Sequence, residues 1–232
     1  MNHISESIEK EETMDKEGRF RSSLFFRAAT NIIYTLHILR AILHIFLLET
    51  SPTRSVIKKD IERWMKMEHF ELYEKRLPAW QSLVWLLWKD EPYRNLFYYR
   101  IKKDYQIFSR IILEAAQWIY KPRNTLFLKA GYIGEGFFIQ HGYATGIGAR
   151  SIGKNCWINQ HVVVGYSDTG KAPTLGDNVH IAMGAKVFGD ITIGDNSIVG
   201  ANAVVTKNVP PNCTVVGVPA RIIKRDGKRV DE

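Results

Sequence analysis

Three histidines and two cysteines in the C-terminal half are the residues whose types could perform chemistry. His141, His161 and His180 carry imidazoles, and a neutral imidazole can act as a general base toward a hydroxyl group. A metal site needs several convergent ligands with partners that orient them, and His161 and His180 alone do not meet this requirement. Cys156 and Cys213 are not clustered as in a zinc site or a disulfide framework. These residues therefore predict no metal site, and a lone histidine outside any further pattern is more often structural than catalytic.

The segment that carries these residues has a six-residue period. Aliphatic residues recur at Ile152, Ile158 and Val164, and after an interruption at Leu175, Ile181, Val187, Ile193, Val199 and Val205. Small or β-branched residues follow four positions later, at Cys156, Val162, Val179, Ala185, Ile191, Ser197, Ala203 and Val209. A period of this kind is typical of a solenoid, in which each unit is one short strand and one corner.

The hexads predict a left-handed parallel β-helix. The aliphatic side chain points into a narrow prism, the small residue fills the space beside it, and glycine or asparagine accepts the backbone conformation of the corner. Three units close one coil, and strands of successive coils pair in parallel. Cys156 occupies one of the interior positions, so we interpret it as a packing residue.

The pattern before this segment is helical, which makes the chain an α+β protein. We predict a polar tail over 1–21, a helical region over 22–125, the β-helix over 126–222 and a basic tail over 223–232. The helical region contains a charged helix over 56–74, a tryptophan-rich segment over 80–101 and a helix over 100–120. Pro78 and Pro92 interrupt this region.

Residues 24–48 are apolar enough to resemble a membrane span. Polar residues recur inside the segment at spacings of three and four, at Arg27, Asn31, Tyr34, His37, Arg40 and His44. Each charge at a bilayer centre would cost about 3 kcal/mol on insertion scales, so we predict an amphipathic helix instead. Its apolar surface is expected to pack in the core or against another subunit, and peripheral membrane contact is the alternative.

The net charge of +8 suits a phosphate-rich ligand, nucleic acid or anionic lipid. No helix-turn-helix, zinc-finger or RNP pattern is present, so nucleic acid is not predicted as a partner. The charged first twenty residues do not form a secretory signal, and two unclustered cysteines fit a reducing compartment. We therefore predict a cytoplasmic protein, with the inner face of the membrane as its one alternative contact.

Residues 130–224 resemble the hexapeptide-repeat acyltransferases. The C-terminal stretch IGDNSIVGANAVVTKNVPPNCTVVGVPARII carries the resemblance, and IGEGFFIQHGYATGIGARSIG is similar to the serine acetyltransferase branch. The resemblance implies acetyl transfer from acetyl-CoA to a hydroxyl group. It also implies a homotrimer or a dimer of trimers, with active sites between neighbouring β-helices.

Within this resemblance, His141 matches the catalytic histidine, which removes the hydroxyl proton during attack on the thioester. His161 is the backup candidate because it lies about one coil further on. The aspartate that orients the histidine in the family aligns with Leu126, and Glu135 is the candidate replacement. Ala172 stands where the family has a second histidine.

The residue before His141 bears on the acceptor. Serine acetyltransferases carry an aspartate there that helps to hold the amino group of serine, whereas this chain has Gln140. The form FIQHGYATGIG instead looks like O-acetyltransferases that act on capsular or exopolysaccharide building blocks. We therefore expect a saccharide acceptor, with serine as the alternative. Gln140 is a candidate acceptor-binding residue, together with Asp168 and Lys171 in the loop that interrupts the repeat.

The resemblance also assigns residues to acetyl-CoA. Small residues that let the pantetheine arm approach the backbone are matched by Ala182, Gly184, Gly200 and Ala201. Cations that could pair with its phosphates are Lys207, Arg221 and Lys224, of which Lys224 fits a solvated basic tail nearly as well.

A noncatalytic trimeric scaffold is the remaining alternative, since no carboxylate partner of His141 is evident in the sequence. A scaffold would keep the oligomer and fail to bind CoA. A serine acetyltransferase would consume acetyl-CoA with L-serine at a normal catalytic rate, although the C-terminal KRDGKRVDE lacks the final isoleucine of family members that dock into a sulfhydrylase.

Overall fold

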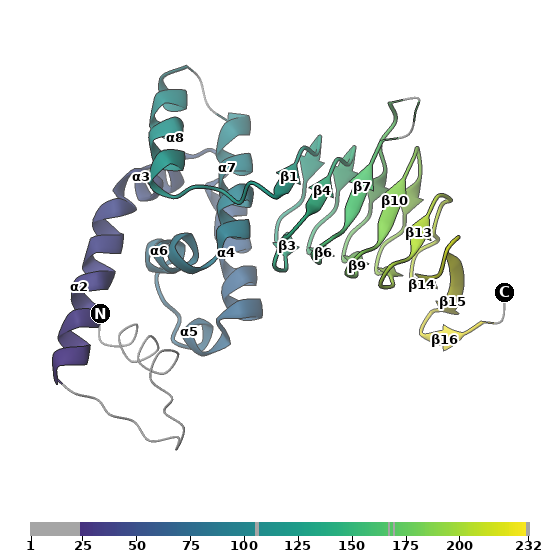
Figure 1. The fold of residues 1–232 in the computed structure, drawn as a ribbon, viewed down its shortest axis with the longest axis horizontal. Coiled ribbons are helices and arrows are strands. Elements are labelled where there is room, and N and C mark those ends of the chain that lie inside the picture. The colour runs from purple at the N-terminus through teal and green to yellow at the C-terminus, as the bar shows by residue number, and fades with distance from the viewer. Residues whose placement is uncertain (1–23, 105–106, 167, 169, 231–232) are drawn as a thin grey trace.

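The computed structural model describes residues 24–104, 107–166, 168 and 170–230. It consists of a helical half followed by a parallel β-helix, which extends away from the helices along the long axis of the molecule (Figure 1). The predicted α+β class and the hexapeptide solenoid are confirmed. The left-handed sense of the coils stays a prediction.

The helical half is built from seven described helices. They are α2 (Leu24–Arg40), α3 (Ile42–Thr50), α4 (Arg54–Glu68), α5 (Phe70–Glu74), α6 (Ala79–Lys89), α7 (Glu91–Asp104) and α8 (Ile107–Ile119). Pro78 precedes the first residue of α6, and Pro92 lies in the first turn of α7, where a missing N–H costs little. The helix expected over 100–120 is divided instead between the end of α7 and α8.

The β-helix has three sheets, and every third strand up to β13 belongs to the same sheet. The first sheet holds β1 (Leu126–Leu128), β4 (Thr145–Ile147), β7 (Val163–Gly165), β10 (Lys186–Phe188) and β13 (Val204–Val205). The second holds β2 (Tyr132–Ile133), β5 (Ser151–Ile152), β8 (Thr174–Leu175) and β11 (Thr192–Ile193). The third holds β3 (Phe138–Ile139), β6 (Trp157–Ile158), β9 (His180–Ile181), β12 (Ile198–Val199), β14 (Cys213–Val216), β15 (Arg221–Arg225) and β16 (Lys228–Arg229).

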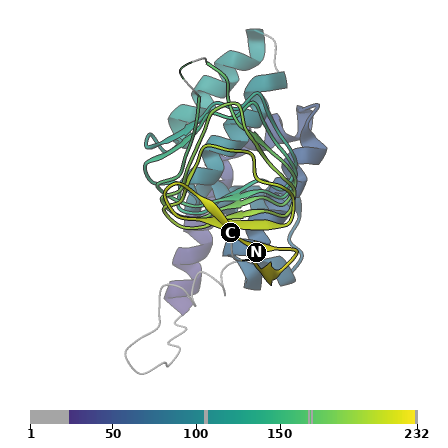
Figure 2. The same ribbon diagram turned by 90° about the vertical axis from the view of Figure 1, so that its right-hand side faces the viewer.

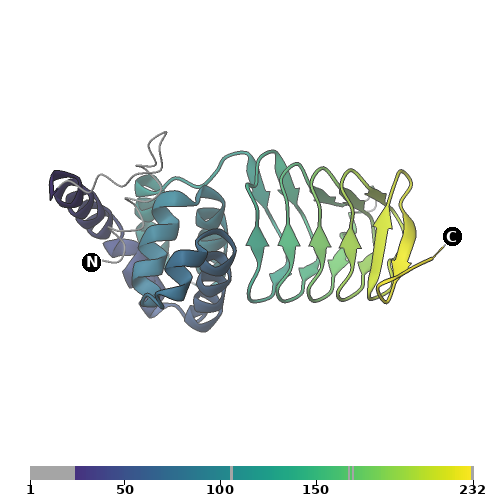
Figure 3. The ribbon, with the colours of Figure 1, turned by 90° about the horizontal axis from the view of Figure 1, so that it is seen from below.

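The strands pair in parallel up to β14, and the cross-section is a triangle when the molecule is viewed from its C-terminal end (Figure 2). The coils stack one above another along the axis (Figure 3). Residues 221–229, which overlap the expected basic tail, form the antiparallel strands β15 and β16 beside β14. This hairpin covers the last coil.

The interior of the prism is filled as the period predicts. All nine aliphatic residues of the six-residue series are buried, and so are the eight residues that follow them by four positions. Cys156 is fully buried, and burial raises the pKa of its thiol to about 12, so it is a packing residue as expected.

Tyr34, His37 and His44 of the predicted polar stripe lie on the inner side of the segment 32–50. The segment bends by 50° between the two helices, α2 and α3. His44 is fully buried and its Nε2 lies 2.8 Å from the Tyr98 hydroxyl, and His37 Nδ1 lies 2.7 Å from the Tyr120 hydroxyl. Apolar side chains on the outer side are exposed: Ile32, Ile33, Leu36, Leu39, Ile42 and Phe46. The outer side of α2 and α3 is therefore an uncovered apolar surface in this protomer, whereas Leu47 and Leu48 on the inner side are fully buried.

A membrane span is not evident in the described residues. No single helix there is both long and apolar enough to cross a bilayer, although the bent pair of helices within 32–50 meets the criteria of length and composition when its two parts are taken together.

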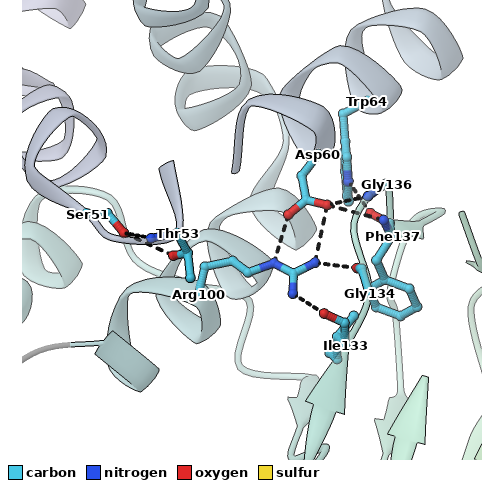
Figure 4. Close-up of polar contacts among 9 residues, drawn as sticks. All are labelled: Ser51, Thr53, Asp60, Trp64, Arg100, Ile133, Gly134, Gly136 and Phe137. Atoms are coloured by element: carbon cyan, nitrogen blue, oxygen red, sulfur yellow. Dashed lines mark hydrogen bonds and ion pairs between the residues drawn. The ribbon is translucent and has the colours of Figure 1, made fainter. Parts of the chain in front are cut away.

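The two halves are joined by a buried ion pair (Figure 4). Arg100 on α7 donates from Nε to Asp60 on α4 over 2.8 Å, and its other nitrogens donate to the carbonyl oxygens of Ile133 and Gly134 in the first coil. Asp60 also accepts hydrogen bonds from the backbone N–H groups of Gly136 and Phe137. The pair therefore fixes α4 and α7 to the turn between β2 and β3.

Candidate functional site

His141 lies at the corner that follows β3, where the first coil meets the helical half. Its side chain is exposed, and its backbone has a φ of 61°, a left-handed conformation that residues other than glycine rarely adopt. Gly142 and Ala144 also have positive φ angles, of 62° and 44°. Corners of the later coils have the same backbone, with φ angles of 60° at His161 and 57° at Asn202, so it is the corner conformation of this solenoid.

The corner with His141 is longer than the equivalent corners of the next coils. Six residues separate Ile139 from Gly146, and their partners in the second coil, Ile158 and Val163, are separated by four. The third coil also has four residues between Ile181 and Lys186. The two additional residues bring the first corner outward, beside the helices.

A cavity of about 140 Å³ lies between this corner and the helical half. It is lined by Trp64, Glu68, Lys89, Asp90, Glu91, Pro92, Arg123, Ile139, His141 and Tyr143. The carboxylates and cations come from the helices and from the segment before β1, whereas the imidazole comes from the β-helix. The site is therefore assembled from both halves of the chain.

Most of the charged side chains in this cavity are already paired. Asp90 lies 2.8 Å from His69 Nε2, and Glu91 lies 3.0 Å from the Arg123 guanidinium. That guanidinium also stacks over the ring of Tyr143, at 3.9 Å from its centroid. Glu68 has no hydrogen bond or ion pair within the described part of the chain.

Three residues of α4 face the turn that leads to His141. Asp60 accepts the hydrogen bonds from Gly136 and Phe137, Trp64 donates from Nε1 to the Phe137 carbonyl over 2.8 Å, and Glu68 lines the cavity of His141. Their spacing of four places them on one side of the helix. The helix is thus aligned along the turn, with Glu68 at the end nearest the imidazole.

The two candidate orienting positions named from the sequence do not supply a carboxylate to His141. Leu126 is buried, and its side chain contacts the position of Gly142. Glu135 precedes β3, whereas His141 follows it, and Glu135 pairs with Lys59 and Lys154. In this protomer Glu135 does not line the cavity of His141, and its role as an orienting residue stays a prediction.

Gln140 is held by a hydrogen-bonded row across the coils. Asn159 donates from Nδ2 to Gln140 Oε1 over 2.7 Å, and its Oδ1 lies 2.8 Å from His180 Nε2. Trp157 stacks on the His180 ring at 4.2 Å, and burial lowers the pKa of His180. His180 is thus a packing residue of this row. His161 is exposed at the corner of the second coil.

The small residues expected along acetyl-CoA line the same corner of the prism as His141. Ala182 and Gly200 follow β9 and β12 and occupy the register of Gln140, and Ala201 follows Gly200. Coil packing alone requires the glycines: a Cβ on Gly184 would lie 2.0 Å from Asn202 Oδ1, and one on Gly200 would lie 2.6 Å from Val216 Cγ1. Their role toward a ligand remains a prediction.

The three cations expected at the phosphates are distributed over different places. Arg221 and Lys224 are exposed on β15, which pairs with β14, and Arg221 stands opposite Val216 near the corner of Gly200. Lys207 follows β13 and lies at the next corner of the prism. Within one protomer, Lys207 is therefore not grouped with the other two.

The loop residues expected at the acceptor are remote from the cavity of His141. Asp168 is exposed in the segment between β7 and β8. Lys171 lies 3.0 Å from Asp190, which also pairs with Arg150. Ala172, at the place of the missing second histidine, is buried. None of these residues lines the cavity in this protomer.

Sequence reasoning missed the residues that the helical half contributes. The spacing of Asp60, Trp64 and Glu68 was a usable signal, because it places a carboxylate, an indole and a second carboxylate on one helical face. Asp90 gave no comparable signal. It lies at the junction of α6 and α7 and meets His141 only because α4 and α7 are fixed to the first coil.

Comparisons with known proteins agree with this fold. Residues 172–207 match the family model described as bacterial transferase hexapeptide (six repeats). The chain is 49% identical over 105 residues to a serine acetyltransferase of Synechococcus elongatus, which is 43% of this chain and 42% of that protein. The matched part thus spans less than half of that relative.

Solved structures of serine acetyltransferases have the same fold. The soybean enzyme complexed with serine has a TM-score of 0.60 at 23% identity, over 78% of this chain and 74% of that one. The Brucella abortus enzyme in complex with coenzyme A has a TM-score of 0.54 at 24% identity, over 87% and 74%. The described chain is therefore a hexapeptide-repeat β-helix with a helical N-terminal half, similar in sequence and fold to serine acetyltransferases.

Proposed function

We propose that the chain transfers the acetyl group of acetyl-CoA to the hydroxyl of serine or a close analogue, with His141 as the general base. The observation that carries the proposal is the cavity in which the His141 imidazole faces carboxylates and a guanidinium from the helical half. The similarity to a protein named serine acetyltransferase, at 49% identity over 105 residues, supports the same reaction.

The acceptor in this proposal differs from the one favoured by the sequence. The saccharide hypothesis depended on Gln140, which stands where the family carries an aspartate. Asp90 and Glu68 provide negative charge in the cavity of His141 without a carboxylate at position 140. The comparisons name serine acetyltransferases, and the resemblance to exopolysaccharide O-acetyltransferases is not supported by them.

The charges of the cavity suit a small zwitterion. Asp90 is oriented by His69 through one carboxylate oxygen, which leaves the other for an ammonium group. Arg123 is held on the Tyr143 ring and is suited to pair with a carboxylate. A neutral sugar would pair with neither charge, and Asp90 and Arg123 would keep only His69 and Glu91 as their partners.

The proposed reaction is a single displacement. The His141 imidazole accepts the hydroxyl proton while the oxygen attacks the thioester carbonyl carbon and forms the new C–O bond. The C–S bond then breaks, and the imidazolium returns the proton to the departing thiolate. His141 is solvent-accessible at a corner, so both substrates can reach it.

Acetyl-CoA is expected along the corner that continues from His141 through Ala182, Gly200 and Ala201. Small side chains there leave the backbone accessible to the pantetheine arm. Arg221 at the far end of this corner is placed to meet a phosphate, and Lys207 would do so only from a neighbouring protomer.

The experiment is a coupled assay of thiol release from acetyl-CoA with L-serine and with free sugars. We expect turnover with L-serine and a loss of about 10²- to 10⁴-fold in His141→Ala, with an unchanged His161→Ala control. Turnover confined to sugars would restore the saccharide hypothesis. Absence of CoA binding in the intact oligomer would instead favour the scaffold.

We further propose that the chain assembles as trimers and that the outer face of α2 and α3 contacts a second copy. This face exposes Leu36, Leu39 and Phe46, and residues 1–23 carry six acidic against four basic side chains, which disfavours an anionic membrane. Leu39→Glu with Phe46→Glu should reduce the mass measured by light scattering. Binding of the wild-type chain to vesicles containing anionic phospholipid would favour the membrane alternative.

A further inference from the structure

We propose that Glu68 is a positioning residue for His141. The Glu68 carboxylate orients the imidazole and stabilises the imidazolium formed during acetyl transfer. This inference rests on the proposed function of His141 as the base. It assigns to the helical half a role that the β-helix does not fill, because the position expected to carry the orienting aspartate is Leu126.

Helix α4 is fixed along the turn that leads to His141. Asp60 and Trp64 bond to the turn at Gly136 and Phe137, and these contacts are buried. Glu68 is the next residue at the same spacing along the helix. Helix α4 therefore positions Glu68 near the end of β3. The left-handed corner with His141 follows that strand and lines the same cavity.

The other carboxylates in and near this site already have partners. Asp90 is engaged by His69, Glu91 by Arg123, and Glu135 by Lys59 and Lys154. Within the part of the chain that the structure describes, Glu68 has no such partner. Glu68 is accordingly the carboxylate of the cavity that is available to interact with His141 when its charge changes.

Glu68 and His141 also interact electrostatically. Burial and the charge of Asp90 raise the pKa of Glu68, whereas positive charge on His141 and His69 lowers it. An interaction that favours the carboxylate when His141 is charged must equally favour charged His141 when the carboxylate is present. The remaining groups that face the imidazole are Lys89, Asp90, Glu91, Arg123 and Tyr143.

The kinetic test compares Glu68→Gln with the wild-type chain over a range of pH. Loss of the negative charge makes the imidazolium easier to deprotonate and the imidazole a weaker base. We expect the acidic limb of the kcat/KM profile to move to lower pH by about one unit and kcat to fall about tenfold, with a similar KM for L-serine. Glu68→Asp should recover part of the loss. Glu62→Gln, on the same helix and away from His141, is the matched control.

A second measurement does not require turnover. The pKa of Glu68, followed by ¹³C NMR of the carboxyl group, should be higher in His141→Asn than in the wild-type chain, because the opposing imidazolium is lost. An equal pKa in the two proteins would overturn the proposal.

The kinetic outcomes also separate the possible roles of Glu68. An unmoved acidic limb with a raised KM for L-serine would mean that Glu68 binds the acceptor and would overturn the positioning role. An inactive wild-type chain would refute the proposed function, and the carboxyl titration would still test whether Glu68 and His141 are coupled.

Discussion

Arg100 and Asp60 form a buried ion pair that also bonds the first coil of the β-helix. The guanidinium and the carboxylate come from two different helices, and together they engage the carbonyl oxygens of Ile133 and Gly134 and the amides of Gly136 and Phe137. Burial raises the pKa of Asp60 to about 6, against the opposing effect of Arg100. This polar cluster therefore helps to fix the helices relative to His141, together with the hydrogen bond from Trp64 Nε1 to the Phe137 carbonyl.

Asp60→Asn should destabilise the fold strongly. It leaves the Arg100 charge buried without its counter-ion, and removal of one partner of a buried pair costs about 3 to 5 kcal/mol. The free energy of unfolding from denaturant titration measures the effect. Asp190→Asn removes a partner of exposed Arg150 and Lys171 and should change stability little. Equal behaviour of the two variants would contradict the structural role of Asp60.

The β-helix could be predicted from the sequence because its restraint is local and periodic. Ile158 and Cys156 must enter the prism wherever the hexads form, so their burial follows from spacing alone. The direction in which α2 and α3 face does not follow in this way. The stripe with His37 and His44 was evident, but its burial depends on the hydroxyl groups of Tyr98 on α7 and of Tyr120, which directly follows α8.

The candidate site was predicted only in the part that belongs to the repeat. His141 and the row of Ala182 and Gly200 share one corner because each follows a strand of the same sheet. Glu68 and Asp90 could not be assigned, since their approach to His141 results from the docking of α4 and α7. Lys207 was expected at the phosphates together with Arg221 because both are cations, whereas Lys207 lies at the corner after β13 in this protomer.

His44 should make the fold sensitive to acid. Burial lowers its pKa from 6.5 to about 4, so the unfolded chain binds a proton first as the pH falls. His44 therefore lowers the free energy of unfolding by roughly 1 kcal/mol per pH unit as the pH falls from 6 to 5.

The measurement is the difference in unfolding free energy between the wild-type chain and His44→Gln at pH 7.5, 6 and 5. Asp60 titrates with the opposite sign in this window, because its raised pKa lets the folded chain bind a proton first, and it contributes equally to both proteins. The wild-type chain should lose stability relative to the variant as the pH falls. A constant difference would mean that His44 does not titrate in this way.

Glycine can be required in the solenoid by the backbone conformation or by the lack of space for a Cβ, and Gly170 and Gly184 differ in this respect. Both have a φ of 73°, but a Cβ on Gly184 would meet Asn202 at 2.0 Å and one on Gly170 would meet nothing within 4 Å. Gly170→Ala should cost about 1 to 2 kcal/mol from backbone strain. Gly184→Ala should cost about 1 to 3 kcal/mol more from overpacking. Thermal unfolding of the two variants measures this difference, and similar midpoints would mean that the coils can adjust at Asn202.

Asp90→Asn tests the acceptor side of the cavity. If the second oxygen of Asp90 pairs with the ammonium of serine, loss of its charge should weaken acceptor binding and leave the acetyl-CoA side unaffected. Loss of a charge-assisted hydrogen bond costs about 1.5 to 3 kcal/mol, so we expect the KM for L-serine to rise about 10- to 100-fold with an unchanged KM for acetyl-CoA. His69→Gln, which keeps a donor beside Asp90, should have a smaller effect. If Asp90→Asn instead lowered kcat without raising the KM for L-serine, Asp90 would act on the chemical step, and the ammonium group would have to be held elsewhere.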